Sequence, residues 1–263
     1  MHGHLASKAA RRQPSQLSRG PCWALVLWFY WLAGCGPVPP VLHMPEASPW
    51  RVPIDDFASR VSTVCVYPTD ISAEELAERA QDFSRRAVAE LKGAGYNAVL
   101  LSEEERKGFH ERAIAAEGSM TDLEFGWLDR DRVDAVQRRQ RLLAREVHGC
   151  DAFLELRVTA VRALWRDGVA KWDGREVQFQ DYLSAQNAWG WTTVLSLHAR
   201  VTDLDNQELY FFAGGIQPIV EIDTWSLFEP WRLMSPDKIL VSEADKTYAL
   251  TLALGPLLVA RLK

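Results

Sequence analysis

The feature that most constrains the fold is a change in the spacing of apolar residues near the middle of the chain. Before about residue 150, short apolar runs alternate with stretches in which apolar residues recur every three or four positions. After it, the segments 152–161 and 191–203 place apolar residues at every second position. The first pattern favours parallel strands covered by helices, and the second favours antiparallel strands with one covered face.

The first half of the predicted domain alternates strands and helices. Val61–Tyr67 is β-branched and apolar and predicts a strand, and Asn97–Leu101 predicts a second one. Ser72–Glu75 and Ser102–Glu105 are typical of capping boxes, so a helix is expected to begin at each. The order strand, helix, strand, helix implies parallel strands joined by helices.

The second half predicts a long helix, three strands and a last helix. These elements are expected at 131–147, 152–161, 191–203, 209–213 and 242–254. Because Pro256 lacks an N–H, the chain after it either continues as a kinked helix or begins a new one. We therefore expect the α/β (α+β) class: a mixed sheet with a β-α-β-α start, later antiparallel strands and a C-terminal helix.

The first 34 residues have the parts of an export signal. Basic residues and no acidic ones precede an unbroken apolar run at 22–33, and the small residues Ala33 and Gly34 follow. At about a dozen residues the run is too short for a bilayer core, which needs roughly 20.

The tetrapeptide Leu32-Ala33-Gly34-Cys35 resembles the lipobox of bacterial lipoproteins. The resemblance implies that Cys35 receives lipid and becomes the first residue of the mature chain, which would anchor the protein to a membrane. Gly36 stands where an aspartate would resemble an inner-membrane retention signal. We therefore expect the outer membrane, with the protein facing the periplasm, and the inner membrane remains open.

The chain is expected to have three parts. Residues 1–34 form the signal, 35–55 a proline-rich tether, and 56–263 a single α/β domain with long loops at 166–190 and 214–236. Six prolines between positions 36 and 53 favour extended geometry. At roughly 3 Å per residue the tether would reach about 50 Å from the membrane.

Charge and cysteines limit the partners and the compartment. Removal of the signal leaves 26 of the 30 basic residues against 35 acidic ones, which argues against nucleic acid and anionic lipid headgroups. Cys65 and Cys150 remain beside Cys35. In an oxidising compartment they could pair, but their apolar surroundings favour two buried free thiols.

The chain contains no recognised catalytic or metal-binding motif. A nucleophile elbow, a phosphate loop and a dinucleotide fingerprint are all missing. No histidine of the mature chain has a second histidine at ligand spacing, so neither a metal nor a cofactor is expected. The sequence therefore favours a protein that is not an enzyme.

Two groups of charged residues have a simpler interpretation than a site. Six arginines between 130 and 145 are interleaved with acids, which favours a solvated helix face with intrahelical ion pairs over a patch for phosphate or an acidic partner. Glu155 and Arg157 are expected to face Ser196, His198 and Arg200 on a neighbouring strand. That group could form a site, or cross-strand charge pairs on an exposed sheet face.

Tryptophans are concentrated between positions 165 and 231. Clustered exposed tryptophans are typical of a partner surface, whereas core packing under long loops is the alternative. The candidate partner surface consists of Trp165, Trp172, Trp189, Trp191, Trp225 and Trp231.

The order of elements over roughly residues 56–260 resembles the periplasmic domain of the curli-secretion channel lipoproteins. It is also similar to the TolB amino-terminal domain and to lipoprotein activators of peptidoglycan synthases. Residues 146–154 resemble the family's passage from helix through glycine to a long strand, and 197–203 resemble its later strand. The turn at 206–208 lacks the glycine that this family usually has there.

The resemblance implies an envelope lipoprotein that acts as a non-enzymatic protein-binding or assembly module, with an envelope protein or a second copy of itself as the partner. One alternative is an oligomeric, curli-channel-like pore subunit in which the two long loops enter the membrane. Neither loop shows the 9–11 residues of clean alternation that a lipid-facing strand needs. A periplasmic enzyme is the other alternative.

Overall fold

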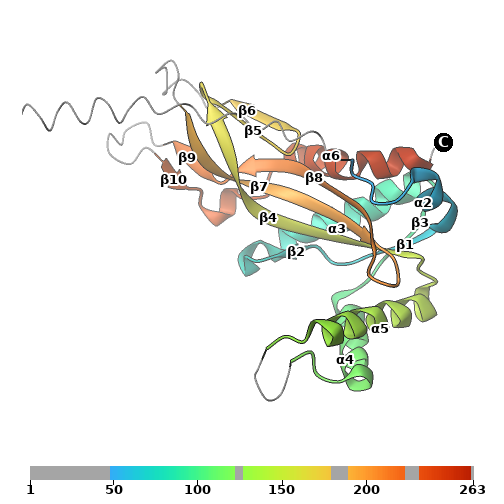
Figure 1. Ribbon diagram of the computed structural model, residues 1–263. Helices are drawn as coiled ribbons and strands as arrows, with labels where there is room; N and C mark the ends of the chain where they lie inside the picture. The colour runs from blue at the N-terminus through green and yellow to red at the C-terminus, as the bar shows by residue number, and fades with distance from the viewer. Residues whose placement is uncertain (1–47, 122–126, 179–188, 223–230, 262–263) are drawn as a thin grey trace, which may run out of the picture. The chain divides into compact units, whose positions relative to one another are not determined.

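The computed structural model describes residues 48–121, 127–178, 189–222 and 231–261 (Figure 1). The chain divides into two units, Met1–Ala47 and Ser48–Lys263, and every described residue belongs to the second unit. The expected signal, Cys35 and most of the expected tether lie outside the described residues.

The main sheet has eight strands and is organised around β1, β4 and β7. Strand β1 (Thr63–Val66) lies between β3 (Asn97–Leu100) and β4 (Ala152–Arg166) and is parallel to both. Strand β4 is antiparallel to β7 (Trp189–Thr202), which is in turn antiparallel to β8 (Glu208–Pro218). The short strand β2 (Asp70–Ile71) adds to β4 in parallel. The expected mixed α/β class is confirmed.

The two segments expected to be long loops contain strands, so that prediction was wrong. Strand β5 (Val169–Trp172) pairs with the end of β4, and β6 (Arg175–Gln178) pairs with β5. A separate two-stranded sheet joins β9 (Val220–Ile222) to β10 (Trp231–Leu233).

The physical reason lies in two Asp-Gly pairs that close two-residue hairpins. Asp167 and Gly168 have φ angles of 51° and 79°, and Asp173 and Gly174 have φ angles of 40° and 72°. Aspartate tolerates this left-handed region and glycine enters it without a steric penalty, so Asp-Gly suits the turn that matches the twist of paired strands.

Helices make up the remaining layers. The α-helices are α2 (Ile54–Arg60), α3 (Ala77–Gly93), α4 (Glu103–Glu117), α5 (Arg130–His148) and α6 (Glu243–Arg261), with short 3-10 helices at Glu74–Leu76 and Pro236–Lys238. The capping box predicted at Ser102 and Glu105 begins α4, whereas the side chain of Ser72 does not cap the helix that follows it. Pro256 lies inside α6, so the helix continues past it.

Alternate residues of β1 face two different helix layers. Val64 and Val66 belong to the main core, which α3 and α6 cover. Cys65 faces the opposite way, into a smaller core that includes Phe109 of α4 and Leu143 of α5. The sheet is therefore covered on one face by α3 and α6, and on the other face, near β1, by α4 and α5.

Cys65 and Cys150 form a disulfide, so the expectation of two free thiols was wrong. Their Cα atoms lie 5.7 Å apart, although 85 positions separate them in the sequence. Because β1 pairs directly with β4, Cys65 lies beside Phe153. Cys150, two positions before the start of β4, is therefore close to Cys65. The sequence alone could not place β4 next to β1 rather than next to β3.

The last residues of the expected tether pack against the domain. Trp50 forms an antiparallel bridge with Tyr210 of β8, and its ring contacts those of Phe57 and Tyr210 at centroid distances of 5.0 and 5.1 Å. Arg51 donates its backbone N–H to the carbonyl of Leu209 at 3.0 Å. The ordered contacts with the domain thus begin before Ile54.

Candidate functional site

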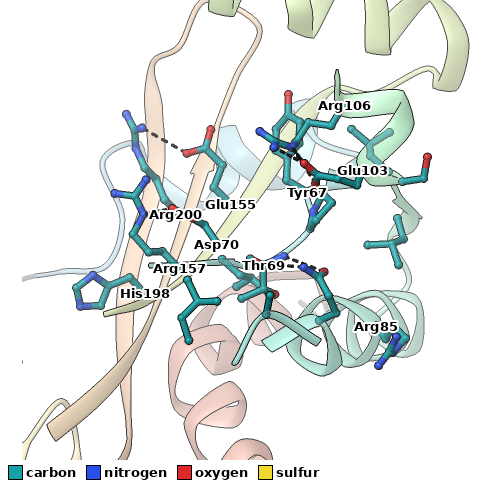
Figure 2. Close-up of a pocket in the computed structure, with 18 of the residues that line it drawn as sticks. Tyr67, Thr69, Asp70, Arg85, Glu103, Arg106, Glu155, Arg157, His198 and Arg200 are labelled. Carbon is teal, nitrogen blue, oxygen red and sulfur yellow. Dashed lines mark hydrogen bonds and ion pairs between the residues drawn. The ribbon is translucent and has the colours of Figure 1, made fainter. Parts of the chain in front are cut away.

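A cavity of about 910 Å³ lies where β1 and β3 end (Figure 2). Its wall combines the residues after β1, the start of α4, the inner side of α5 and the polar face of β4 and β7. Figure 2 shows Glu155, Arg157 and Arg200 on one side of the view, and Glu103 and Arg106 on the other.

The topology explains why a cavity forms at this point. The chain leaves β1 through α3 to reach β3 on one side, and later passes through α4 and α5 to reach β4 on the other side. The first connection leaves the carboxyl end of β1 and the second leaves that of β3, so the two run in opposite directions across the sheet. In open α/β sheets such a switch point leaves a crevice outside the strand ends, and ligands bind there.

The strand side of the cavity has the charged group that the sequence predicted. Glu155 stands opposite Arg200, and Arg157 stands opposite His198, in the β4–β7 register. Arg200 Nη1 lies 3.6 Å from a carboxylate oxygen of Glu155, and its Nε lies 3.0 Å from Glu208. The prediction of facing charges is confirmed, and they line the cavity.

The ion pairs at the mouth of the cavity are exposed. Arg157 Nε lies 2.8 Å from Asp70, and the two side chains are 68% and 62% exposed. Arg106 pairs with Glu103 one helical turn away in α4. Exposed pairs of this kind contribute about 0–1 kcal/mol, because water competes for both charges.

Arg141 of α5 differs from these residues because its side chain is only 4% exposed. Its Nη2 donates to Glu155 at 3.1 Å, and its Cζ lies 5.8 Å from the centroid of the Phe153 ring. Its Nε and Nη1 atoms are buried and have no hydrogen-bond partner. Arg141 is therefore a buried cation at the cavity wall with unused donors.

For Arg141, the prediction of a solvated helix face was wrong. The position lies three residues before the buried Ala144, so both side chains project from the same side of α5. Arg132 does make the expected intrahelical pair, at 3.2 Å from Asp129, and Arg138 pairs instead with Asp205 at 2.8 Å. The helical spacing between Arg141 and Ala144 indicates a buried arginine. The clustering of six arginines favoured a solvated helix face instead.

Neutral donors complete the inner wall. Burial raises the pKa of Tyr67 to about 12, against the opposing charge of Arg141, so its hydroxyl stays protonated at neutral pH. The Tyr67 ring stacks on that of Phe153 at 5.9 Å. Thr69 donates its N–H to Gln81 Oε1 at 3.2 Å and accepts from Gln81 Nε2 at 3.2 Å, which holds the loop after β1 against α3.

The candidate partner surface of tryptophans is not brought together as expected. Trp165 and Trp172 are each 8% exposed and belong to a third apolar cluster with Ala163, Ala170 and Val194. Trp172 Nε1 donates to the carbonyl of Leu195 at 3.1 Å.

For Trp165 and Trp172 the prediction of a partner surface was therefore wrong, because both rings pack into this apolar cluster. Trp191 is 59% exposed and is still available to a partner. The side chains of Trp189, Trp225 and Trp231 lie outside the described part of the chain.

Neither a metal-binding cluster nor a membrane-spanning helix is found among the described residues. Within the described ranges, no group of three or more His, Cys, Asp or Glu side chains is placed to hold a metal ion. None of the helices described is both long enough and apolar enough to span a bilayer.

Comparison with known proteins does not assign the chain to a family. No protein-family model matches the chain, and no curated protein matches it. Solved structures that resemble it include two crystal forms of a PelC dodecamer from Paraburkholderia phytofirmans, one of them of a variant. They are 11% and 13% identical, each covers 75% of this chain and 90% or 88% of its own, and the TM-scores are 0.34 and 0.32. A likeness at this level carries no conclusion for this chain.

Proposed function

We propose that the chain is an exported lipoprotein, anchored through Cys35, that acts as a non-enzymatic protein-binding or assembly module of the bacterial envelope. The observation that carries the proposal is the order of its first segments: basic residues, an apolar run, and then Leu32-Ala33-Gly34-Cys35. The outer membrane, with the domain in the periplasm, is the location that Gly36 favours.

The disulfide supports export. Cys65 and Cys150 pair in the structure, and such bonds persist in oxidising compartments and are rare in the cytosol. The disulfide is therefore expected to persist where the domain is secreted or periplasmic.

The polar face of the sheet supports a binding role. On this face α4 and α5 pack near β1, while Arg157 of β4 remains 68% exposed beside the cavity. Charged side chains arranged on rigid strands can recognise a partner with little loss of conformational freedom on binding. The partner is an envelope protein or a second copy of the chain.

The anchor is tested by Cys35→Ser in cells that express the full chain. The unaltered protein is expected in the membrane fraction and to incorporate labelled palmitate, while the variant is expected to lose the label. Cys22→Ser, a matched change within the apolar run, should keep it. An unlabelled native chain, or equal labelling of the Cys35 variant, contradicts the proposal.

The binding role is tested by site-specific photo-crosslinking in intact cells. A crosslinker at Arg157 is expected to give discrete protein adducts, whereas one at Lys107, on the exposed side of α4, should give fewer. Detergent-extracted protein is then run on a sizing column. A large homogeneous ring of subunits in that run would favour the pore subunit instead.

A further inference from the structure

We propose that the cavity at the ends of β1 and β3 is a binding site for a ligand that presents an oxyanion, a phosphate or a carboxylate, with Arg141 as the central contact. This inference goes beyond the proposed function and does not depend on it. The cavity belongs to the folded domain, whether or not Cys35 carries lipid.

The first argument is the incomplete pairing of a buried cation. Among the described residues, Arg141 pairs with the carboxylate of Glu155 alone, and it shares that carboxylate with Arg200, whose Nη1 lies 3.6 Å away. Its Nε and Nη1 are buried without an acceptor. Buried charges are normally paired and hydrogen-bonded, because loss of hydration is otherwise uncompensated. An oxyanion bound beside Glu155 would add a second negative partner to this incompletely paired guanidinium.

The second argument is the charge of the cavity wall. The chain as a whole has a net charge of −5. The wall nevertheless contains five arginines and three carboxylates, namely Arg85, Arg106, Arg141, Arg157 and Arg200 with Asp70, Glu103 and Glu155. Asp82 and Glu208 pair with Arg85 and Arg200 from outside the lining. The lining alone therefore carries an excess of two positive charges, which favours an anion over a cation.

The third argument is that the outer arginines can change partners. Arg157 and Arg106 are held by exposed carboxylates, Asp70 and Glu103, in pairs that water already weakens. An incoming oxyanion can replace those carboxylates at small cost. Arg141 in contrast is held in place by Glu155 and by the ring of Phe153, so it is preorganised.

The size of the cavity and its neutral donors indicate the rest of the ligand. A volume of about 910 Å³ is much larger than one phosphate or carboxylate group and lies in the range of small-molecule sites. The Tyr67 hydroxyl, which remains protonated, and the side chains of Gln137 and Gln140 are further donors at the wall. The ligand therefore has an anionic group attached to a larger polar body.

The test uses the full chain extracted in detergent, with inorganic phosphate as the first probe. Phosphate is expected to raise the thermal midpoint with increasing concentration and to bind measurably by calorimetry. Arg141→Met should weaken phosphate binding tenfold or more. Arg138→Met removes the same charge from an exposed position of the same helix and should leave the binding constant unchanged.

Glu155→Gln separates a binding role from a structural one. Glutamine keeps a side-chain oxygen that can accept from Arg141 and removes the negative charge that Arg141 and Arg200 share, so phosphate should bind at least threefold more tightly to this variant. A variant that merely loosened the fold would bind more weakly. If Arg141→Met does not fold, the direction in which Glu155→Gln changes phosphate affinity still decides whether the cavity binds an oxyanion.

The chemical source of the anion is distinguished by two further probes, acetate and a short tetraglutamate peptide. Tighter binding of the peptide than of acetate points to a carboxylate on a partner protein, and selective binding of phosphate points to a phosphorylated small molecule. The proposal is overturned if none of the three probes binds at about 10 mM, well above a weak millimolar Kd. It is overturned equally if Arg141→Met binds phosphate as the native chain does.

Discussion

Gly214 lies where α6 crosses β8, and the backbone of the helix leaves no room there for a side chain. A Cβ atom at this position would come within 2.1 Å of the carbonyl oxygen of Ala249. The obstacle is backbone, which cannot move aside as a flexible side chain can. We expect Gly214→Ala to lower the free energy of unfolding by about 3 kcal/mol, the upper part of the usual range for overpacking. Urea denaturation measures it.

Gly108→Ala is the matched control, because Gly108 lies within α4 and has nothing within 4 Å of an added Cβ. It should leave stability unchanged or raise it by about 0.5–1 kcal/mol, since alanine restricts the unfolded chain. Equal losses in the two variants would mean that α6 does not approach β8 as closely as described.

At the scale of single residues, the candidate site was predictable only in part. Period-two spacing places Glu155 and Arg200 on the polar side of their strands, and the antiparallel pairing of β4 with β7 sets the two residues opposite each other. Nothing comparable identifies Tyr67 or Arg106, because the path of the chain around β1 decides which loops meet. Arg141 was within reach, since its place on the helix follows from Ala144.

At the scale of elements, the strands and helices with strong periodicity were predictable. The helix over 131–147 and the strand over 152–161 exist and extend further, and the strand over 191–203 is found at Trp189–Thr202. The β4–β5–β6 hairpins were overlooked although Asp167-Gly168 and Asp173-Gly174 are turn signals. Their strands are only four residues long, too short to establish a period.

The disulfide joins two elements that a long stretch of chain separates. It closes a loop of 85 positions that contains α3, β3, α4 and α5. Crosslinking a loop of that length restricts the unfolded ensemble, by about 4–5 kcal/mol in the chain-entropy account. We expect the double variant Cys65→Ala with Cys150→Ala to lose about that much stability, measured as the shift in urea midpoint.

Reduction of the native protein is the parallel measurement. A reductant should shift the midpoint of the native chain towards that of the double variant and should not affect the variant itself. Two titratable thiols at these positions in the unreduced, unfolded chain would show that the bond does not form.

At the scale of the whole domain, residues 48–53, which precede α2, attach the preceding chain to the sheet. Trp50 packs on Phe57 and Tyr210, and Arg51 pairs with Glu208 at 3.0 Å. We expect Trp50→Ala to cost about 2 kcal/mol, less than for a fully buried tryptophan, because the side chain is half-buried. Limited proteolysis should then cut between 48 and 54 more readily.

Trp191→Ala is the control for that change. Trp191 is 59% exposed, so its removal should alter stability by no more than about 0.5 kcal/mol. If Trp50→Ala and Trp191→Ala behave alike in both measurements, the segment at 48–54 does not hold to the sheet as described.

The attachment of this segment also has a mechanical consequence. Any pull that reaches the domain from residues before Ser48 acts first on two backbone hydrogen bonds, Arg51 N–H to Leu209 at 3.0 Å and Phe211 N–H to Pro49 at 2.8 Å. Both bonds end on β8, the strand that α6 covers. The domain therefore takes up tension through its sheet.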